Sequence, residues 1–239
     1  MHLAKILVLV VAVAALAMMV AAGPGTRFDV WTYRTGLSML AWSTWTGIAA
    51  VVLAVILLGV SSVPRWHSSR ALPFAALVLA LVAIAPPLIL LGKAKSVPPI
   101  HDITTDTADP PAFVALMPAR AAAPNGAAYG GEAVAKQQRE AYPDIKPLTT
   151  KEGVAEATQR ASDLARALGW DVVATDMAAG RVEATATTGW FGFKDDVVVR
   201  VRPEGSGGSR LDVRSVSRVG RSDIGANAAR VREFLSRLA

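Results

Sequence analysis

The sequence predicts N-terminal transmembrane α-helices followed by an α+β domain. Three long apolar runs occupy the first 95 residues, and a stretch rich in Pro, Ala and Gly follows them. After it, two amphipathic helix patterns enclose four strand patterns. The order αββββα is typical of a two-layer sandwich, a four-stranded antiparallel sheet with two helices on one face. We therefore expect a membrane anchor (1–95), an extended connector that packs on the domain (96–148) and an α+β soluble domain (149–239).

The three apolar runs cover residues 3–22, 40–60 and 72–91. Each has the length that an α-helix needs to cross the hydrocarbon core of a bilayer. Pro86 and Pro87 are expected to kink or end the third helix. No run carries Asp, Glu or Arg at its centre, whereas ion pathways and carriers usually need such a group. We interpret the runs as an anchor in the lipid bilayer rather than as a channel or transporter.

The net charge of +6 lies entirely in the anchor part, because residues 1–99 hold seven basic residues and one acid, and residues 100–239 hold 18 of each. A nucleic-acid-binding domain carries its positive excess on the folded part, so we expect no nucleic acid as a partner. The basic residues that flank the runs do not decide the orientation. The first run also resembles a signal peptide. If this run is retained with its N-terminus inside, three spans place the C-terminal domain outside, and if it is cleaved, the two remaining spans do the same. We therefore expect a bacterial inner-membrane protein with a periplasmic domain.

Residues suited to catalysis or metal binding are scarce. The chain has no Cys and three His, which excludes disulfides and thiolate sites and makes a metal centre improbable. It has no phosphate-binding loop, dinucleotide fingerprint or serine nucleophile elbow. His101–Asp102 is either a proton-handling pair or an Asp that caps its own turn. Asp195 and Asp196 are adjacent on a strand and point to opposite faces. We expect no enzyme and no cofactor.

The soluble domain begins with a predicted helix. Thr149 and Glu152 form a capping box, apolar residues follow from Val154 to Leu168, and Gly169 ends the helix. The second helix follows Ser222 or Asp223 as its cap. Four strands are expected between the helices, over residues 170–175, 181–187, 196–202 and 210–217.

Alternation along these strands places charged residues on the face away from the helices. The short turn at 205–209 predicts that Arg200 faces Asp212 and that Arg202 faces Arg210. In the other hairpin we expect Glu183 to face Arg200. Arg200 would then lie between two carboxylates in structural ion pairs, each contributing roughly 0.2–1 kcal/mol.

Two segments of the domain are candidate contact sites. The first joins a strand end, a glycine turn and a helix start, where anions bind well, and contains Arg214, Arg218, Arg221, Asp223 and Asn227. It holds either an external anion or an internal cluster of Asp223 with the arginines. The second is a hairpin loop with Trp190, Phe191 and Phe193. This loop either enters a membrane or partner, or folds back on the core.

Several segments resemble the family catalogued as domain of unknown function 1499. They are Pro99-Ile-His-Asp-Ile-Thr-Thr-Asp, the Tyr142-Pro143 turn, Phe193-Lys-Asp-Asp-Val and the run from Arg214 to Asn227. The resemblance covers about residues 98–238. It implies a bacterial or plastid protein, often behind a signal or membrane segment, without established activity, cofactor or catalytic residue.

We expect a non-enzymatic membrane-anchored interaction module, an accessory subunit or assembly factor of an envelope membrane complex. Its partner would be another envelope membrane protein. The alternative is a binding module for a lipid headgroup or other anion at the helix start beside Arg218 and Arg221.

Overall fold

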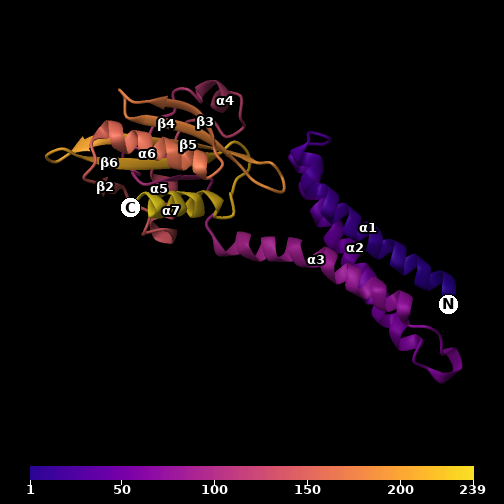
Figure 1. Cartoon of the computed structure of the whole chain (residues 1–239). Coiled ribbons are helices and arrows are strands. Elements are labelled where there is room, and N and C mark those ends of the chain that lie inside the picture. Colours follow the sequence, from indigo (N-terminus) through magenta and orange to yellow (C-terminus); the bar gives the residue numbers. More distant parts are fainter. The chain divides into compact units, whose positions relative to one another are not determined.

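The computed structural model describes every residue from Met1 to Ala239 and divides into two compact units (Figure 1). The first unit comprises Met1–Lys93 together with the short segment Gly189–Gly192. The second comprises Ala94–Thr188 and Phe193–Ala239.

The first unit is built from three helices, α1 (His2–Arg27), α2 (Tyr33–Val60) and α3 (Ala71–Ser96). A short 3₁₀ helix, η1 (Pro64–Trp66), lies between α2 and α3. All three long helices are long and apolar enough to cross a membrane. Helix α3 continues through Pro86 and Pro87 to Ser96. Of the two expectations for these prolines, that they end the helix is therefore wrong.

Small side chains form the contacts between these helices, whereas many of the large apolar side chains are exposed. The buried cluster consists of Val8, Ala12, Ala50, Ala54, Ala76 and Ala80. Alanines let helix backbones approach closely, which is how transmembrane helices pack when lipid offers no hydrophobic drive between them. The basic residue of the first run, Lys5, is buried and donates hydrogen bonds to Ser68 Oγ (2.7 Å) and to the Ser69 carbonyl (2.6 Å).

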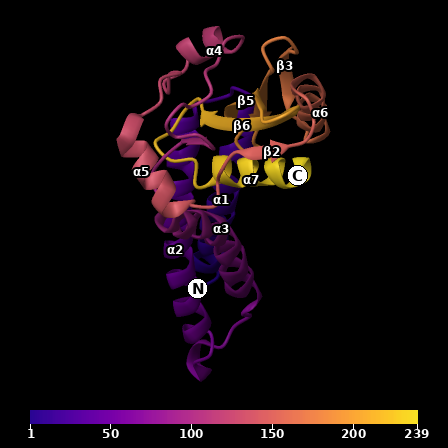
Figure 2. The same cartoon turned by 90° about the vertical axis from the view of Figure 1, so that its left-hand side faces the viewer.

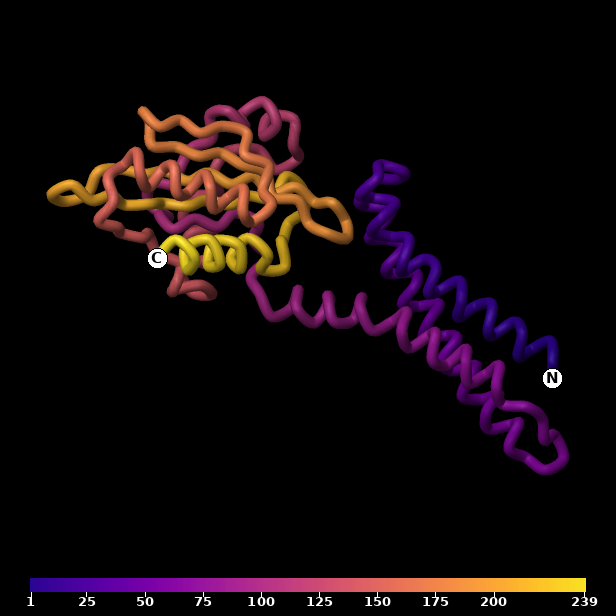
Figure 3. The backbone as a smooth tube through the Cα atoms, viewed as in Figure 1, coloured from indigo at the N-terminus to yellow at the C-terminus, as the bar shows by residue number.

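The second unit contains an antiparallel sheet of six strands rather than the expected four. The strands are β1 (Asp102–Thr104), β2 (Leu148–Thr150), β3 (Asp171–Asp176), β4 (Arg181–Thr187), β5 (Lys194–Glu204) and β6 (Gly208–Ser217). Their order is β1-β6-β5-β4-β3, and β2 also pairs with β6. The turn of the β5–β6 hairpin projects beyond the other strands (Figure 3).

The two additional strands come from the connector. Each has only three residues, so neither shows the alternation that identifies a strand. Thr149 and Thr150 pair with Arg210 and Ser209 in the sheet, and the next helix begins at Val154 after Gly153. The predicted capping box at Thr149 is therefore wrong, because those residues belong to the hydrogen-bond ladder of β2.

The connector also forms two helices, α4 (Met117–Ala121) and α5 (Gly131–Ala141). Helix α5 protects the edge of β1 through the side-chain amide of Gln138. Its Oε1 accepts from the Thr104 N–H (3.0 Å) and its Nε2 donates to the Thr104 carbonyl (2.6 Å). The amide thus takes the place of a neighbouring strand, which satisfies an edge that would otherwise be open to other chains.

The main core lies between the sheet and helices α6 (Val154–Ala167) and α7 (Ala226–Leu238). Alanines of α6, together with Val231 and Phe234 of α7, pack in one cluster with Val197, Val199 and Val213 of the sheet. Figure 2 shows α7 and α4 on opposite sides of β5 and β6. The sheet therefore buries apolar side chains toward α7 and is also covered on the side of α4.

Candidate functional site

The connector covers the charged face of the sheet. We name residues 105–130, which include α4, the strap. Phe113 and Leu116 of the strap are buried against Val198 and Val216 of the sheet. Beneath the strap, Glu183, Asp196 and Asp212 are fully buried, and a buried charge needs a partner within the protein.

Glu183 fastens the strap to β4. Its carboxylate is fully buried and accepts hydrogen bonds from the backbone N–H groups of Val114 (2.9 Å), Ala115 (3.1 Å) and Leu116 (2.9 Å). It also pairs with Arg181 Nε at 3.2 Å. Glu183 lies opposite Val198 in the β4–β5 register, and Arg200 lies opposite Arg181. The expectation that Glu183 faces Arg200 is wrong, because the register differs by two residues.

Arg200 does face Asp212, with Nη2 at 3.1 Å from its carboxylate. Arg202 and Arg210 bind the same carboxylate at 2.9 and 3.1 Å. Two acids of the strap complete this ionic cluster, which contains Asp106, Asp109, Asp212, Arg200, Arg202 and Arg210. Three acids balance three bases, so this cluster carries no net charge.

The pKa of Asp106 lies below its usual range. Partial burial of its carboxyl acts to raise the pKa, but backbone hydrogen bonds from Asp109 and Ala108 and the charges of Arg210 and Arg200 outweigh burial. Asp106 is therefore held in its ionised form, as the cluster requires.

Arg214 forms a second, almost fully buried pair with Asp102 of β1. Its Nε and Nη2 donate to the two carboxylate oxygens at 3.0 and 2.8 Å. The guanidinium also lies over the rings of Phe113 (5.4 Å) and Tyr129 (5.5 Å). Burial, followed by the charge of Asp102, raises the pKa of Tyr129 to about 12. Such a bidentate, ring-stacked guanidinium links β6, β1 and the strap in one geometry.

Arg218 is bound to Asp196, with Nη2 2.8 Å from Oδ1. Asp196 is fully buried and also accepts from Thr185 Oγ1 (2.8 Å) and from Arg120 Nη1 of the strap (3.3 Å). Burial is the main reason that the pKa of Arg120 is lowered, although the charge of Asp196 acts in the opposite direction.

Asp195 points away from this group and pairs with Arg230 of α7 at 2.7 Å. The two adjacent aspartates thus lie on opposite faces of the sheet and share no ligand.

The start of α7 is occupied by Asp223. Its two carboxylate oxygens accept the N–H groups of Gly225 and Asn227, each at 2.8 Å. Burial raises the pKa of Asp223, and the two backbone hydrogen bonds oppose that shift. The Asn227 side chain is buried and bonded to Ser215, Ser217 and the His101 carbonyl. An internal carboxylate thus satisfies the free N–H groups that make a helix start attractive to anions.

Arg221 differs from the other candidate residues because it is exposed and its side chain forms no ion pair. It lines a cavity of about 360 Å³ together with residues of the connector, including His101, Asp102 and Gln137. Its backbone carbonyl accepts a hydrogen bond from His101 Nδ1 at 3.3 Å. Of the two interpretations of His101–Asp102, the proton-handling pair is not assembled, since both carboxylate oxygens of Asp102 are bound by Arg214.

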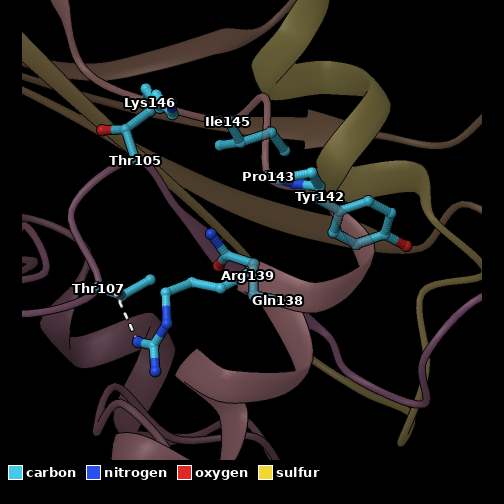
Figure 4. Close-up of a pocket in the computed structure, with 8 residues that line it drawn as sticks. All are labelled: Thr105, Thr107, Gln138, Arg139, Tyr142, Pro143, Ile145 and Lys146. Atoms are coloured by element: carbon cyan, nitrogen blue, oxygen red, sulfur yellow. Dashed lines mark hydrogen bonds between the residues drawn. The ribbon is translucent and has the colours of Figure 1, made fainter.

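A second cavity of about 400 Å³ lies beside α5 and is drawn in Figure 4. Its polar groups are largely used within the protein. Gln138 bonds to Thr104, and Arg139 bonds to Glu132 and to Thr107 at 3.4 Å. The Tyr142 hydroxyl points away from the other labelled side chains in Figure 4. The side chains of this cavity therefore do not converge on one ligand position.

The loop Gly189–Gly192 is grouped with the helical unit, and Phe193 with the sheet unit. Phe191 is 6% exposed. Trp190 and Phe191 meet edge to face, with ring centroids 5.1 Å apart. The three aromatics are therefore divided between the two units. Neither interpretation of the loop, entry into a membrane or partner or folding back on the core, applies to all three together.

Residues of the connector were missed as part of the polar site. Asp106, Asp109 and Arg120 complete the ionic groups beneath the strap. They lie in a segment without a sustained period, so no sequence pattern relates them to partners that lie 76 to 104 residues later. A signal is present in the composition: residues 100–199 hold 9 basic and 14 acidic residues, whereas residues 200–239 hold 9 and 4. Opposite net charges of this kind indicate pairing between the two halves.

The comparison with known families agrees with the extent of the second unit. Residues 102–238, more than half of the chain, match the family described as Protein of unknown function (DUF1499). The matched segment starts with β1 and ends at the last residue of α7. No curated protein matches the chain. The chain therefore belongs to the DUF1499 family, and in it the family domain follows three apolar helices consistent with membrane anchoring.

Proposed function

We propose that this protein is a non-enzymatic, membrane-anchored interaction module, serving as an accessory subunit or assembly factor of an envelope membrane complex. The partner is another membrane protein, which pairs an extended segment with strand β3. The strand is the observation that carries this proposal, because β3 pairs with β4 on one side and with no strand on the other.

Strand β3 has two features of a strand that accepts a partner. Its outer backbone edge is open, and an open edge is a template for pairing with another chain. The side chains of Val173 and Met177, in and after the strand, are 47% and 38% exposed. The opposite edge of the sheet is treated differently, since the amide of Gln138 satisfies the Thr104 backbone there. Arg200, Arg202 and Arg210 are engaged in internal ion pairs.

Purification in a mild detergent, followed by mass spectrometry of co-purifying proteins, tests this proposal. We expect a stoichiometric membrane-protein partner that is lost in Val173→Lys, since an edge lysine opposes strand addition. Met117→Lys is the matched control, because Met117 is also an exposed apolar residue of the domain but lies on the strap. A partner that survives Val173→Lys, or no stoichiometric partner, would contradict the proposal.

The alternative function, an anion or lipid headgroup held by Arg218 and Arg221 at the helix start, meets two internal competitors. Arg218 would have to leave the buried carboxylate of Asp196. Asp223 would have to release the N–H groups of Gly225 and Asn227. Uncovering a buried charge is costly, so the geometry favours the interaction module over this site.

We further propose that the helices lie in a bacterial inner membrane and that the domain is periplasmic. If the first span is kept with its N-terminus inside, three spans place the domain outside. If the first span is removed as a signal peptide, the two remaining spans also place the domain outside. Alkaline phosphatase fused after Ala239 should be active, and a fluorescent reporter that folds in the cytoplasm should be dark at the same position. A cytoplasmic readout from both fusions would overturn this orientation.

A further inference from the structure

We propose that the cavity lined by His101, Gln137 and Arg221 is a binding site for a small monocarboxylate with a compact apolar body. This inference does not depend on the interaction function proposed above. The cavity lies within the second unit, between the start of β1, helix α5 and the turn that precedes α7. Its volume of about 360 Å³ falls within the range of sites for small molecules.

Arg221 is the residue that points to an anionic ligand. Residues 94–239 contain 14 arginines, and 13 of them form ion pairs within the protein. Arg221 is the exception. Every other guanidinium of the domain is neutralised by an acid of the protein. Arg221 lines a cavity and has no such acid, so its guanidinium is suited to bind an anion supplied from outside. Arginine is also the side chain that binds a carboxylate with two parallel hydrogen bonds.

The neighbouring side chains differ in what they offer a ligand. His101 Nδ1 lies 3.3 Å from the Arg221 carbonyl. Because a carbonyl can only accept, Nδ1 carries the hydrogen, and Nε2 of the neutral ring is an acceptor rather than a donor. The Gln137 amide nitrogen uses one hydrogen on the Ala133 carbonyl (3.2 Å) and keeps a second N–H. The hydrogen bond from His101 also holds the backbone of Arg221 beside the cavity.

The charge around the cavity selects a monoanion. Asp102 lines the cavity too, but its two oxygens are bound by Arg214 at 3.0 and 2.8 Å. The pair of Asp102 and Arg214 is neutral, so the net positive charge at the cavity is the single charge of Arg221. One positive charge balances a monoanion. It does not balance a doubly charged phosphate, which would also lie beside the Asp102 carboxylate. Ile100, which is buried, and Val134, which is half-buried, supply the apolar part of the lining. A carboxylate attached to a small apolar group matches both halves of this lining.

The test uses the full chain in nanodiscs of zwitterionic lipid and 4-fluorobenzoate as the probe, observed by fluorine NMR. We expect the probe signal to broaden with the wild-type protein and to recover when excess acetate competes. Arg221→Gln should weaken binding about tenfold, as expected for losing a charge-assisted contact. Arg221→Lys should bind with intermediate affinity because it keeps the charge without the planar fork.

Arg237→Gln is the matched control. Arg237 lies in the last turn of α7, has an exposed side chain and pairs with Glu233. It should bind the probe as the wild type does, and the melting temperatures of all variants should agree, since both arginines are at the surface. Three results would overturn the inference: no broadening at millimolar probe, equal losses in Arg221→Gln and Arg237→Gln, or displacement by inorganic phosphate but not by acetate.

Discussion

The bond between Glu183 and the strap is the most informative contact to perturb. Glu183→Gln keeps the size of the side chain but removes the charge that three backbone N–H groups share. The hydrogen bonds from Val114 and Ala115 to Oε1, the oxygen that glutamine retains, each become weaker by about 1 kcal/mol. This is the difference between a charged and a neutral acceptor. The third, that of Leu116, then faces an amide NH₂, and its lost bond costs about 1–3 kcal/mol. We expect a total destabilisation of about 3–5 kcal/mol.

The assay is hydrogen exchange read by mass spectrometry on the full chain in detergent. Peptides that contain Val114–Leu116 should exchange faster in Glu183→Gln, and the urea midpoint of the domain should fall. Glu140→Gln is the matched control, because Glu140 is exposed on α5 and forms no ion pair. Unchanged protection at 114–116, with a midpoint like that of the control, would refute the conclusion that Glu183 fastens the strap.

Three further predictions concern the same domain. Arg214→Lys should destabilise it by about 2–4 kcal/mol in urea unfolding, since lysine cannot hold both oxygens of Asp102; equal midpoints would contradict this. Phe234→Ala should cost about 3–5 kcal/mol and alter the fluorescence of Trp170, whose ring stacks on Phe234 at 5.2 Å; an unchanged spectrum would oppose the stacking. The folded-state pKa of Asp106 is depressed, so its contribution to the free energy of unfolding is present above the ordinary carboxyl range and is lost as pH falls. Asp106→Asn should therefore make the free energy of unfolding depend less on pH in the acid range. A stronger dependence on pH in this variant would contradict the direction of the pKa shift.

Periodic patterns in the sequence determined the parts of this protein that depend on local order. The three predicted spans each lie inside α1, α2 or α3, because a helix that crosses a bilayer must be apolar over its length. Strands β4, β5 and β6 were found from alternation. The short turn between β5 and β6 placed Arg200 opposite Asp212 as predicted, since a tight turn leaves few possible registers.

The tertiary structure decided what the charged residues do. The loop between β4 and β5 is longer, and the register across it, with Glu183 opposite Val198, did not follow from the sequence. The pair of Asp102 and Arg214 joins residues 112 positions apart, and no local pattern records such a contact. Short strands such as β1 carry too few residues to show a period, and they form only because β6 offers a free edge. Acids of the strap and of the sheet pair with Arg200, Arg202, Arg210, Arg214 and Arg218 and make them structural, whereas Arg221 forms no ion pair.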